Sequence, residues 1–262
     1  MTHTVDNIRL FGMYGLKYFQ FASEGDAMYI DFTQNVFIGM IALFLVCGIV
    51  GYLMGSMNFA IIISRLKYHD DIRKYGSGNA GMTNMMRTYG RAAGIVTFVC
   101  DILKAVVAVY LGWFMLGEAG GHFAGFCGIL GHCFPLWYKF KGGKGVAVAA
   151  ATILCLEPLL FVFVLLVFVV IVAFTRYISL GSIMAALMYP VLLGNVYAAV
   201  HRVQSPFYFI VITCATLTAL MILFMHRSKM RRLLDHTENK FSFKKKGEKK
   251  AVNSAEIASE EK

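Results

Sequence analysis

Two short glycine-rich segments hold the residues of this chain whose types and spacing best suit the binding of an anion. The first contains, in order, Gly76, Ser77, Gly78, Asn79, Gly81, Thr83 and Asn84. Glycines allow consecutive backbone N–H groups to converge on an anion, and Ser, Thr and Asn side chains add neutral donors. Arg87 follows and carries a planar fork that suits phosphate. The segment is predicted to bind a phosphate group, and a flexible turn without a ligand is the alternative.

The glycine spacing of this segment also matches two nucleotide-binding motifs, but neither is supported. Gly76, Gly78 and Gly81 satisfy G-x-G-x-x-G, yet no β-α-β unit surrounds them. Met82 stands where a P-loop has its lysine. Nucleotide binding is therefore not predicted.

The second segment places Gly142, Gly143 and Gly145 around Lys144, directly before an apolar helix predicted from Val146. A helix N-terminus with exposed amides and a neighbouring cation is a favourable anion site. The alternative is a lysine that only anchors its helix at lipid headgroups. If both segments face one compartment, they predict two substrates that each carry phosphate.

The elements that must position these residues are apolar helices. Of 262 residues, 58% are hydrophobic and 15% charged, and the mean hydropathy is +0.63, whereas soluble domains have about 45–50% apolar and about 25% charged residues. These values exclude disorder and favour an all-α integral membrane protein over a soluble enzyme. Two of the seven predicted spans are short and end at Pro135 and Pro158, so they are expected to be tilted, broken or re-entrant. The spans are 36–57, 92–116, 120–135, 145–157, 158–174, 177–200 and 206–225.

The distribution of basic residues predicts the orientation. If the spans alternate, 21 of the 25 Lys and Arg residues fall on one side and three on the other, and Lys104 lies within a span. The positive-inside rule then places the N-terminus outside and the C-terminus in the cytoplasm. Both glycine segments face the cytoplasm in this topology. Residues 1–35 form a lead-in to which no chemistry is assigned, 36–239 form the membrane domain, and 240–262 form a disordered tail.

Three further ionisable residues lie in or beside the spans. Asp101 and Lys104 are three apart on one helical face, either as an ion pair that braces the bundle or as groups that orient Arg87 or a ligand. His226 lies at the cytoplasmic edge of the last span, where it either caps the helix or takes part in chemistry. The sequence contains no carboxylate cluster suited to Mg²⁺ and no C-x-x-C pair, so no metal or cofactor is predicted.

Several motifs in order resemble one family, the bacterial acyl-phosphate:glycerol-3-phosphate acyltransferases of the PlsY type. The resemblance covers roughly 48–238. It rests on Gly76–Asn84 with Arg87 and Gly90, Asp101 with Lys104, Gly131–Pro135, Lys141–Val146, Arg176–Ser182, and His226–Arg227 through Arg232–Leu234 to Glu238.

The resemblance implies a seven-helix enzyme of the bacterial inner membrane with its active site at the cytoplasmic face. It would move an acyl chain from acyl phosphate to the 1-hydroxyl of glycerol 3-phosphate, giving lysophosphatidate and phosphate. Expected partners are these two substrates, membrane lipids and the enzyme that produces acyl phosphate, but not nucleic acid. The residues implied as catalytic are Ser77, Arg87, Lys144 and His226. Those implied in substrate binding are Gly76, Gly78, Asn79, Gly81, Thr83, Asn84, Lys104, Gly142, Gly143, Gly145, Ser179, Ser182, Lys229 and Glu238.

Four positions depart from the family pattern: Met82 replaces Ala, Ala105 replaces Gly, Lys229 replaces Asn and His236 replaces Gly. The residues alone leave two points open, namely which segment holds which phosphate, and whether the hydroxyl proton goes to His226 or to the acyl phosphate. An acyl-Ser77 intermediate is not expected, because no Ser–His–Asp order occurs nearby. The absence of a His-x-x-x-x-Asp pair favours an acyl-phosphate donor. A transporter of a phosphorylated or anionic small molecule is the main rival interpretation, and a structural membrane anchor is a third.

Overall fold

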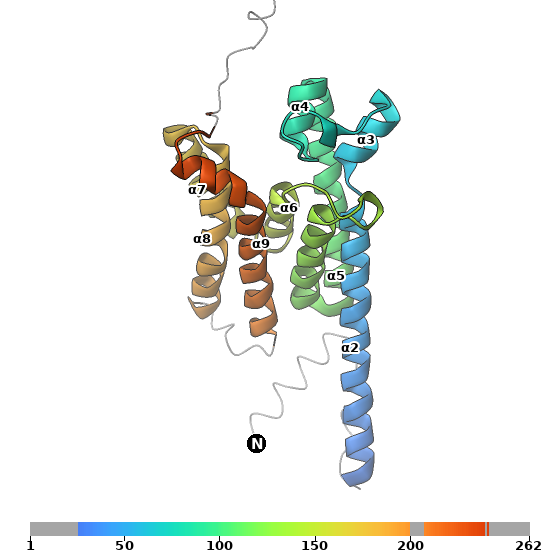
Figure 1. The fold of residues 1–262 in the computed structure, drawn as a ribbon. Coiled ribbons are helices and arrows are strands. Elements are labelled where there is room, and N and C mark those ends of the chain that lie inside the picture. Colours follow the sequence, from blue (N-terminus) through green and yellow to red (C-terminus); the bar gives the residue numbers. More distant parts are fainter. Residues whose placement is uncertain (1–25, 200–206, 239, 241–262) are drawn as a thin grey trace, which may run out of the picture. The chain divides into compact units, whose positions relative to one another are not determined.

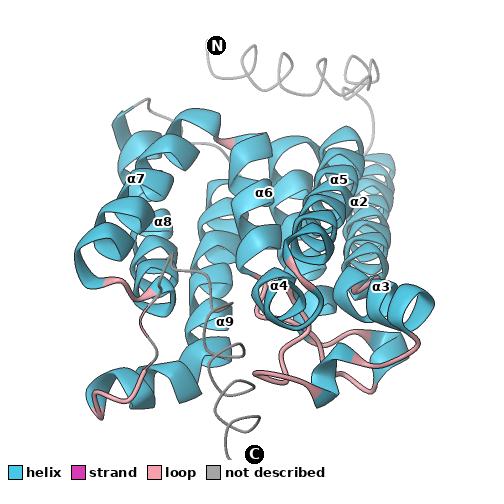
Figure 2. Cartoon of the chain, turned by 90° about the horizontal axis from the view of Figure 1, so that it is seen from above, coloured by secondary structure: helices cyan, strands magenta, loops and turns pink. Residues whose placement is uncertain are grey.

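The computed structural model describes residues 26–199, 207–238 and 240, with side chains from residue 36 onward, and this part of the chain contains only helices and loops (Figure 2). The helices are α2 (Asp26–Ser56), α3 (Phe59–Tyr68), α4 (Met82–Tyr89), α5 (Arg91–Cys133), α6 (Val146–Leu156), α7 (Pro158–Thr175), α8 (Ile178–Ala199) and α9 (Tyr208–Leu234), with two 3₁₀ turns, η1 (Ile72–Lys74) and η2 (Leu136–Tyr138).

The chain divides into two compact units, residues 1–46 and residues 47–262, and all contacts described below lie within the second. The helix α2 begins at Asp26, inside the stretch predicted as a lead-in, and its part from Val36 onward belongs to the first apolar span. Residues 1–25 and the tail after residue 240 lie outside the described residues.

The long helix α5 reverses direction near its middle. Leu116 and Gly117 have non-helical dihedral angles, and Gly117 has φ 61° and ψ −147°, a combination that favours glycine. A straight helix would separate Asp101 from His132 by about 45 Å at 1.5 Å per residue, yet their side chains lie 3.6 Å apart. The two arms therefore run antiparallel (Figure 1), and they correspond to the predicted spans 92–116 and 120–135.

Five helices of the described part are long and apolar enough to cross a membrane. They are Val36–Tyr68, Arg91–Tyr138, Pro158–Thr175, Ile178–Ala199 and Tyr208–Leu234. The first includes α2 and α3, the second is the folded α5 and η2, and the apolar α6 is shorter, at 11 residues. The break predicted at Pro158 is confirmed, since α6 ends at Leu156 and α7 begins at Pro158.

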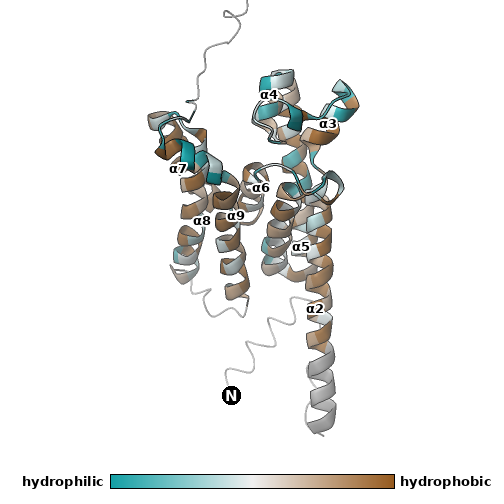
Figure 3. Cartoon of the chain, viewed as in Figure 1, coloured by the Kyte–Doolittle hydropathy of each residue, from teal (hydrophilic) through white to brown (hydrophobic). Residues whose placement is uncertain are grey.

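Small residues allow the helices to pack closely. A Cβ added at Gly55 of α2 would lie 2.1 Å from the carbonyl oxygen of Gly128 in α5, and one at Gly51 would lie 2.5 Å from that of Ala124. Such contacts between small residues are typical of membrane helices, where van der Waals packing replaces the hydrophobic effect. Polar residues gather on α3, α4 and their loops, and on the C-terminal part of α9, whereas the long helices are mainly apolar (Figure 3).

Candidate active site

The first glycine segment is a loop that Asn84, one turn into α4, holds in shape. Nδ2 of Asn84 donates to the carbonyl oxygens of Ile72 (3.2 Å) and Tyr75 (2.9 Å), and Oδ1 accepts from the backbone N–H of Ser77 (3.0 Å). Gly76 has φ 59°, and a Cβ there would lie 2.2 Å from Oδ1 of Asn84. Both amide protons of the buried Asn84 are thus used within the loop, which favours a positioning role over the predicted contact with substrate.

The other residues predicted to bind phosphate in the first glycine segment and at the start of α4 are exposed or partly exposed. Ser77, Gly78, Thr83 and Arg87 are exposed, and Asn79 and Gly81 are partly exposed. Gly81 caps α4 through its backbone carbonyl, which accepts from the N–H groups of Asn84 and Met85. In the part of the chain that the structure describes, the guanidinium of Arg87 has no hydrogen bond or ion pair, so its donors remain available to a ligand.

The second glycine segment folds back over the end of α5. The N–H of Gly142 donates to the carbonyl of Cys133 and that of Gly143 to the carbonyl of His132, each at 3.0 Å. The carbonyl of Gly142 accepts from the N–H of Ala80 in the first loop (3.4 Å). The two segments predicted to bind phosphate are therefore neighbours in space.

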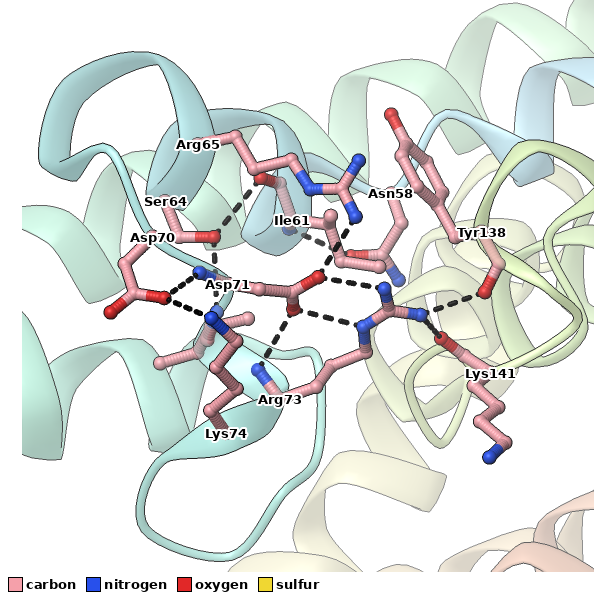
Figure 4. Close-up of polar contacts among 11 residues, drawn as sticks. Asn58, Ile61, Ser64, Arg65, Asp70, Asp71, Arg73, Lys74, Tyr138 and Lys141 are labelled. Atoms are coloured by element: carbon pink, nitrogen blue, oxygen red, sulfur yellow. Dashed lines mark hydrogen bonds and ion pairs between the residues drawn. The ribbon is translucent and has the colours of Figure 1, made fainter.

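A pair of residues that sequence reasoning did not select also joins the two loops (Figure 4). Asp71 binds Arg73 through Nε at 2.9 Å and Nη2 at 2.7 Å, and Nη1 of Arg73 donates to the carbonyls of Tyr138 (2.7 Å) and Lys141 (3.0 Å). The hydrogen bonds from Arg73 hold the pKa of Asp71 well below its usual range. In the sequence, Asp71 and Arg73 are two of many charged residues in one connection, and nothing there indicated this contact.

Lys144 lies within the second glycine loop, and charged groups at the end of α9 and just after it act on its ammonium. Burial and the positive charges of Lys229 and Arg232 together lower the pKa of its ammonium to about 8, against the opposing effect of Glu238. Within the described residues, the ammonium of Lys144 has no hydrogen bond or ion pair. A partly buried cation without a partner is costly unless an anion binds to it.

Glu238 connects the chain after α9 to α9 itself and to α8. Its carboxylate accepts from Lys229, from Nε of Arg232 (2.8 Å) and from Oγ of Ser179 on α8 (3.2 Å). Burial alone would raise the pKa of Glu238, but the hydrogen bonds from Lys229 and Arg232 lower it overall. The carboxylate therefore holds Lys229, whose charge acts on Lys144.

His226 is buried one turn before Lys229 on α9, with Nδ1 2.8 Å from the carbonyl oxygen of Ile222. A carbonyl oxygen only accepts hydrogen bonds, so Nδ1 carries the proton of the neutral ring. The lone pair on Nε2 is then left to act as an acceptor.

The Asp101–Lys104 ion pair predicted from the sequence is confirmed, at 2.8 Å and almost fully buried. The same ammonium donates to the carbonyls of Gly55 (3.0 Å) and Met57 (2.8 Å) and lies 3.0 Å from Nδ1 of His132. Lys104 is thus surrounded by protein groups, which favours bracing over substrate contact. Ser182 likewise donates to the carbonyl of Ile178 on its own helix (3.0 Å).

The fold and the polar groups together define an all-helical integral membrane protein. Its two glycine loops adjoin, and within the described ranges Arg87 and Lys144 are cations without a hydrogen bond or ion pair. Among the described residues, no group of three His, Cys, Asp or Glu side chains is arranged to hold a metal ion. The chain belongs to the glycerol-3-phosphate acyltransferase family, whose model matches residues 45–236.

Relatives and solved structures agree with this membership. The chain is 38% identical over 196 residues to a glycerol-3-phosphate acyltransferase of Finegoldia magna, which covers 75% of this chain and 95% of the relative. It is 37% identical over 198 residues to glycerol-3-phosphate acyltransferase 2 of Bacillus cereus, covering 76% and 95%.

The crystal structure of PlsY (YgiH), an integral membrane glycerol 3-phosphate acyltransferase, in its glycerol 3-phosphate form has a TM-score of 0.68 and 32% identity, covering 76% of this chain and 96% of that one. Its lysophosphatidic acid form has a TM-score of 0.66 and 31% identity, covering 76% and 95%. The protein is an acyltransferase, and this decides between the enzyme and the transporter interpretations.

Proposed function

We propose that this acyltransferase moves an acyl chain from acyl phosphate to the 1-hydroxyl of glycerol 3-phosphate, releasing lysophosphatidate and inorganic phosphate. The hydroxyl oxygen attacks the acyl carbon and forms the new ester bond. The bond from that carbon to the phosphate oxygen breaks, and phosphate leaves with the electron pair. No cofactor takes part, because the mixed anhydride is already activated.

The observation that carries this proposal is the ammonium of Lys144, between Gly143 and Gly145, which is partly buried and has no hydrogen bond or ion pair among the residues that the structure describes. The positive charges of Lys229 and Arg232 lower its pKa, and the carboxylate of Glu238 raises it. Such an excess of positive charge suits a phosphate dianion. Ser77, exposed on the adjoining loop, and Arg87, exposed on α4, would hold the second phosphate.

The protein's contribution is then to position two anionic substrates and to stabilise the charge that develops on the leaving phosphate. The hydroxyl proton goes either to Nε2 of His226 or to an oxygen of the acyl phosphate. Lys229 would bind phosphate as an ammonium, where the family pattern has a neutral Asn.

We also propose that the chain crosses the bacterial inner membrane seven times, counting both arms of α5 and the short α6. The excess of Lys and Arg around the glycine loops and after α9 supports a cytoplasmic active site, a cytoplasmic C-terminus and an N-terminus outside.

The test uses the full chain purified in lipid nanodiscs, with glycerol 3-phosphate and either palmitoyl phosphate or palmitoyl-CoA. We expect phosphate and lysophosphatidate to appear together with palmitoyl phosphate and neither product with palmitoyl-CoA. Turnover with the CoA ester alone would reject the proposed donor. Lys144→Met, compared with Lys240→Met outside the site, tests whether the ammonium of Lys144 is needed.

A further inference from the structure

The guanidinium of Arg73 lies between the two glycine loops and is hydrogen-bonded on both of its edges (Figure 4). One edge meets the carboxylate of Asp71 in two parallel bonds, and Nη1 meets the backbone carbonyls of Tyr138 and Lys141. The Arg73 side chain is 20% exposed and that of Asp71 is 15% exposed, so water competes little for these bonds.

The two carbonyls that Arg73 holds enclose a strained turn. Lys139 and Phe140, which lie between them, have φ of 57° and 55°, in the left-handed region that non-glycine residues avoid. The turn leads directly from Lys141 into Gly142, Gly143 and Lys144. Its shape therefore decides where the ammonium of Lys144 lies.

The other end of this contact is fixed to the first glycine loop. Asp71 caps η1 by accepting from the N–H of Arg73 (3.1 Å), and it also accepts from Arg65 (2.9 Å). The turn η1 is also tied to α4, because Asn84 donates to the carbonyl of Ile72. A displacement of Arg73 would therefore be felt in both loops.

We propose that Arg73, oriented by Asp71, is a positioning residue for the Lys144 loop, and that it sets the distance between the two phosphate-binding loops without touching substrate. This inference rests on the proposed function. Lysine cannot replace it, since one ammonium cannot hold a carboxylate in two parallel bonds and reach two carbonyls in the plane beyond.

The first measurement is the steady-state kinetics of Arg73→Met, Arg73→Lys and Asp71→Asn. The matched control is Lys74→Met, which removes a positive charge from the residue next to Arg73. Lys74 forms an ion pair with Asp70, and its side chain is largely exposed. We expect both Arg73 variants to raise KM for at least one phosphate substrate by about tenfold, with kcat within about threefold of the wild type. Lys74→Met should keep both constants. A folded Arg73 variant with unchanged KM values overturns the proposal, and so does a loss confined to kcat.

The second measurement does not depend on turnover. Trypsin cleaves after lysine, and Lys139 and Lys141 are both exposed in the turn that Arg73 holds. Mass spectrometry should find faster cleavage at these two bonds in Arg73→Lys and Asp71→Asn than in Lys74→Met. Equal rates in all variants would reject the proposal, even if Arg73→Met did not fold. A wild type that folds but lacks transferase activity would reject the proposed function, while the cleavage rates would still test the ordering of the loop.

Discussion

Nε2 of His132 lies directly against Gly143: a Cβ added at Gly143 would be 2.0 Å from that nitrogen and 2.7 Å from the carbonyl oxygen of Ala80. The second glycine loop therefore passes between the imidazole at the end of α5 and the first glycine loop. No side chain fits at this position. Packing alone therefore requires glycine before Lys144, whether or not the amide of this glycine binds an anion.

Gly143→Ala should displace the loop and lower kcat/KM by about 10²-fold, because a shift of about 1 Å in a positioned group has effects of that size. Gly194→Ala is the matched control, since its added Cβ would meet only Ile212, at 4.0 Å. Activity assays and thermal unfolding of both variants check this. Wild-type activity in Gly143→Ala would mean that the loop is not held as described.

The pKa of about 8 at Lys144 predicts an alkaline limit to activity. The ammonium attracts phosphate below this pH and loses its charge above it, so kcat/KM should fall about tenfold per pH unit beyond about pH 8. Lys144→Arg keeps its charge at any accessible pH and should lack this decline. A wild-type profile that stays flat to about pH 10 would contradict the assignment.

Lys229→Asn should move the same alkaline limit to higher pH. The positive charge of Lys229 lowers the pKa of Lys144, so its removal raises that pKa, and Glu238 then acts on Lys144 with less of its charge neutralised. Both effects have the same sign. The pH profile of kcat/KM measures the shift, and a shift toward lower pH would show that Lys229 does not act on Lys144.

His226→Ala separates the two routes for the hydroxyl proton. An obligatory base predicts a loss in kcat of at least about 10²-fold, whereas proton uptake by the acyl phosphate predicts a smaller loss or one confined to KM. His226→Asn is the matched variant, because its amide can still donate to the carbonyl of Ile222 but cannot take up a proton. If Asn restores the activity that Ala loses, His226 is not the base.

Lys104→Met should destabilise the protein by about 3–5 kcal/mol, since it leaves Asp101 buried without its partner. The double variant Asp101→Asn with Lys104→Met should recover part of this loss, because no charge then remains. Thermal unfolding in one detergent measures both. A double variant less stable than the single one would mean that the ion pair is not what Lys104 contributes.

Sequence patterns predicted the features that depend on composition along one helix: the apolar spans, the break at Pro158 and the Asp101–Lys104 pair at helical spacing. They did not reveal that only two residues, Leu116 and Gly117, separate the two arms of α5. They also did not reveal that α2 begins at Asp26. Nor did they single out Arg73, because its side chain binds carbonyls 65 and 68 residues further along the chain. In a loop rich in donors, residue type alone does not distinguish a group that binds ligand from one that shapes the loop.

The reversal at Leu116–Gly117 also fixes how the returning arm of α5 is rotated about its own axis. Each residue of an α-helix turns the chain by about 100°, so the length of the turn decides which face of the returning arm meets the outgoing one. One residue inserted after Gly117 would rotate His132 away from Lys104 and carry the second glycine loop with it. The geometry of the two glycine loops is thus set by a count of residues at the opposite end of the α5 hairpin.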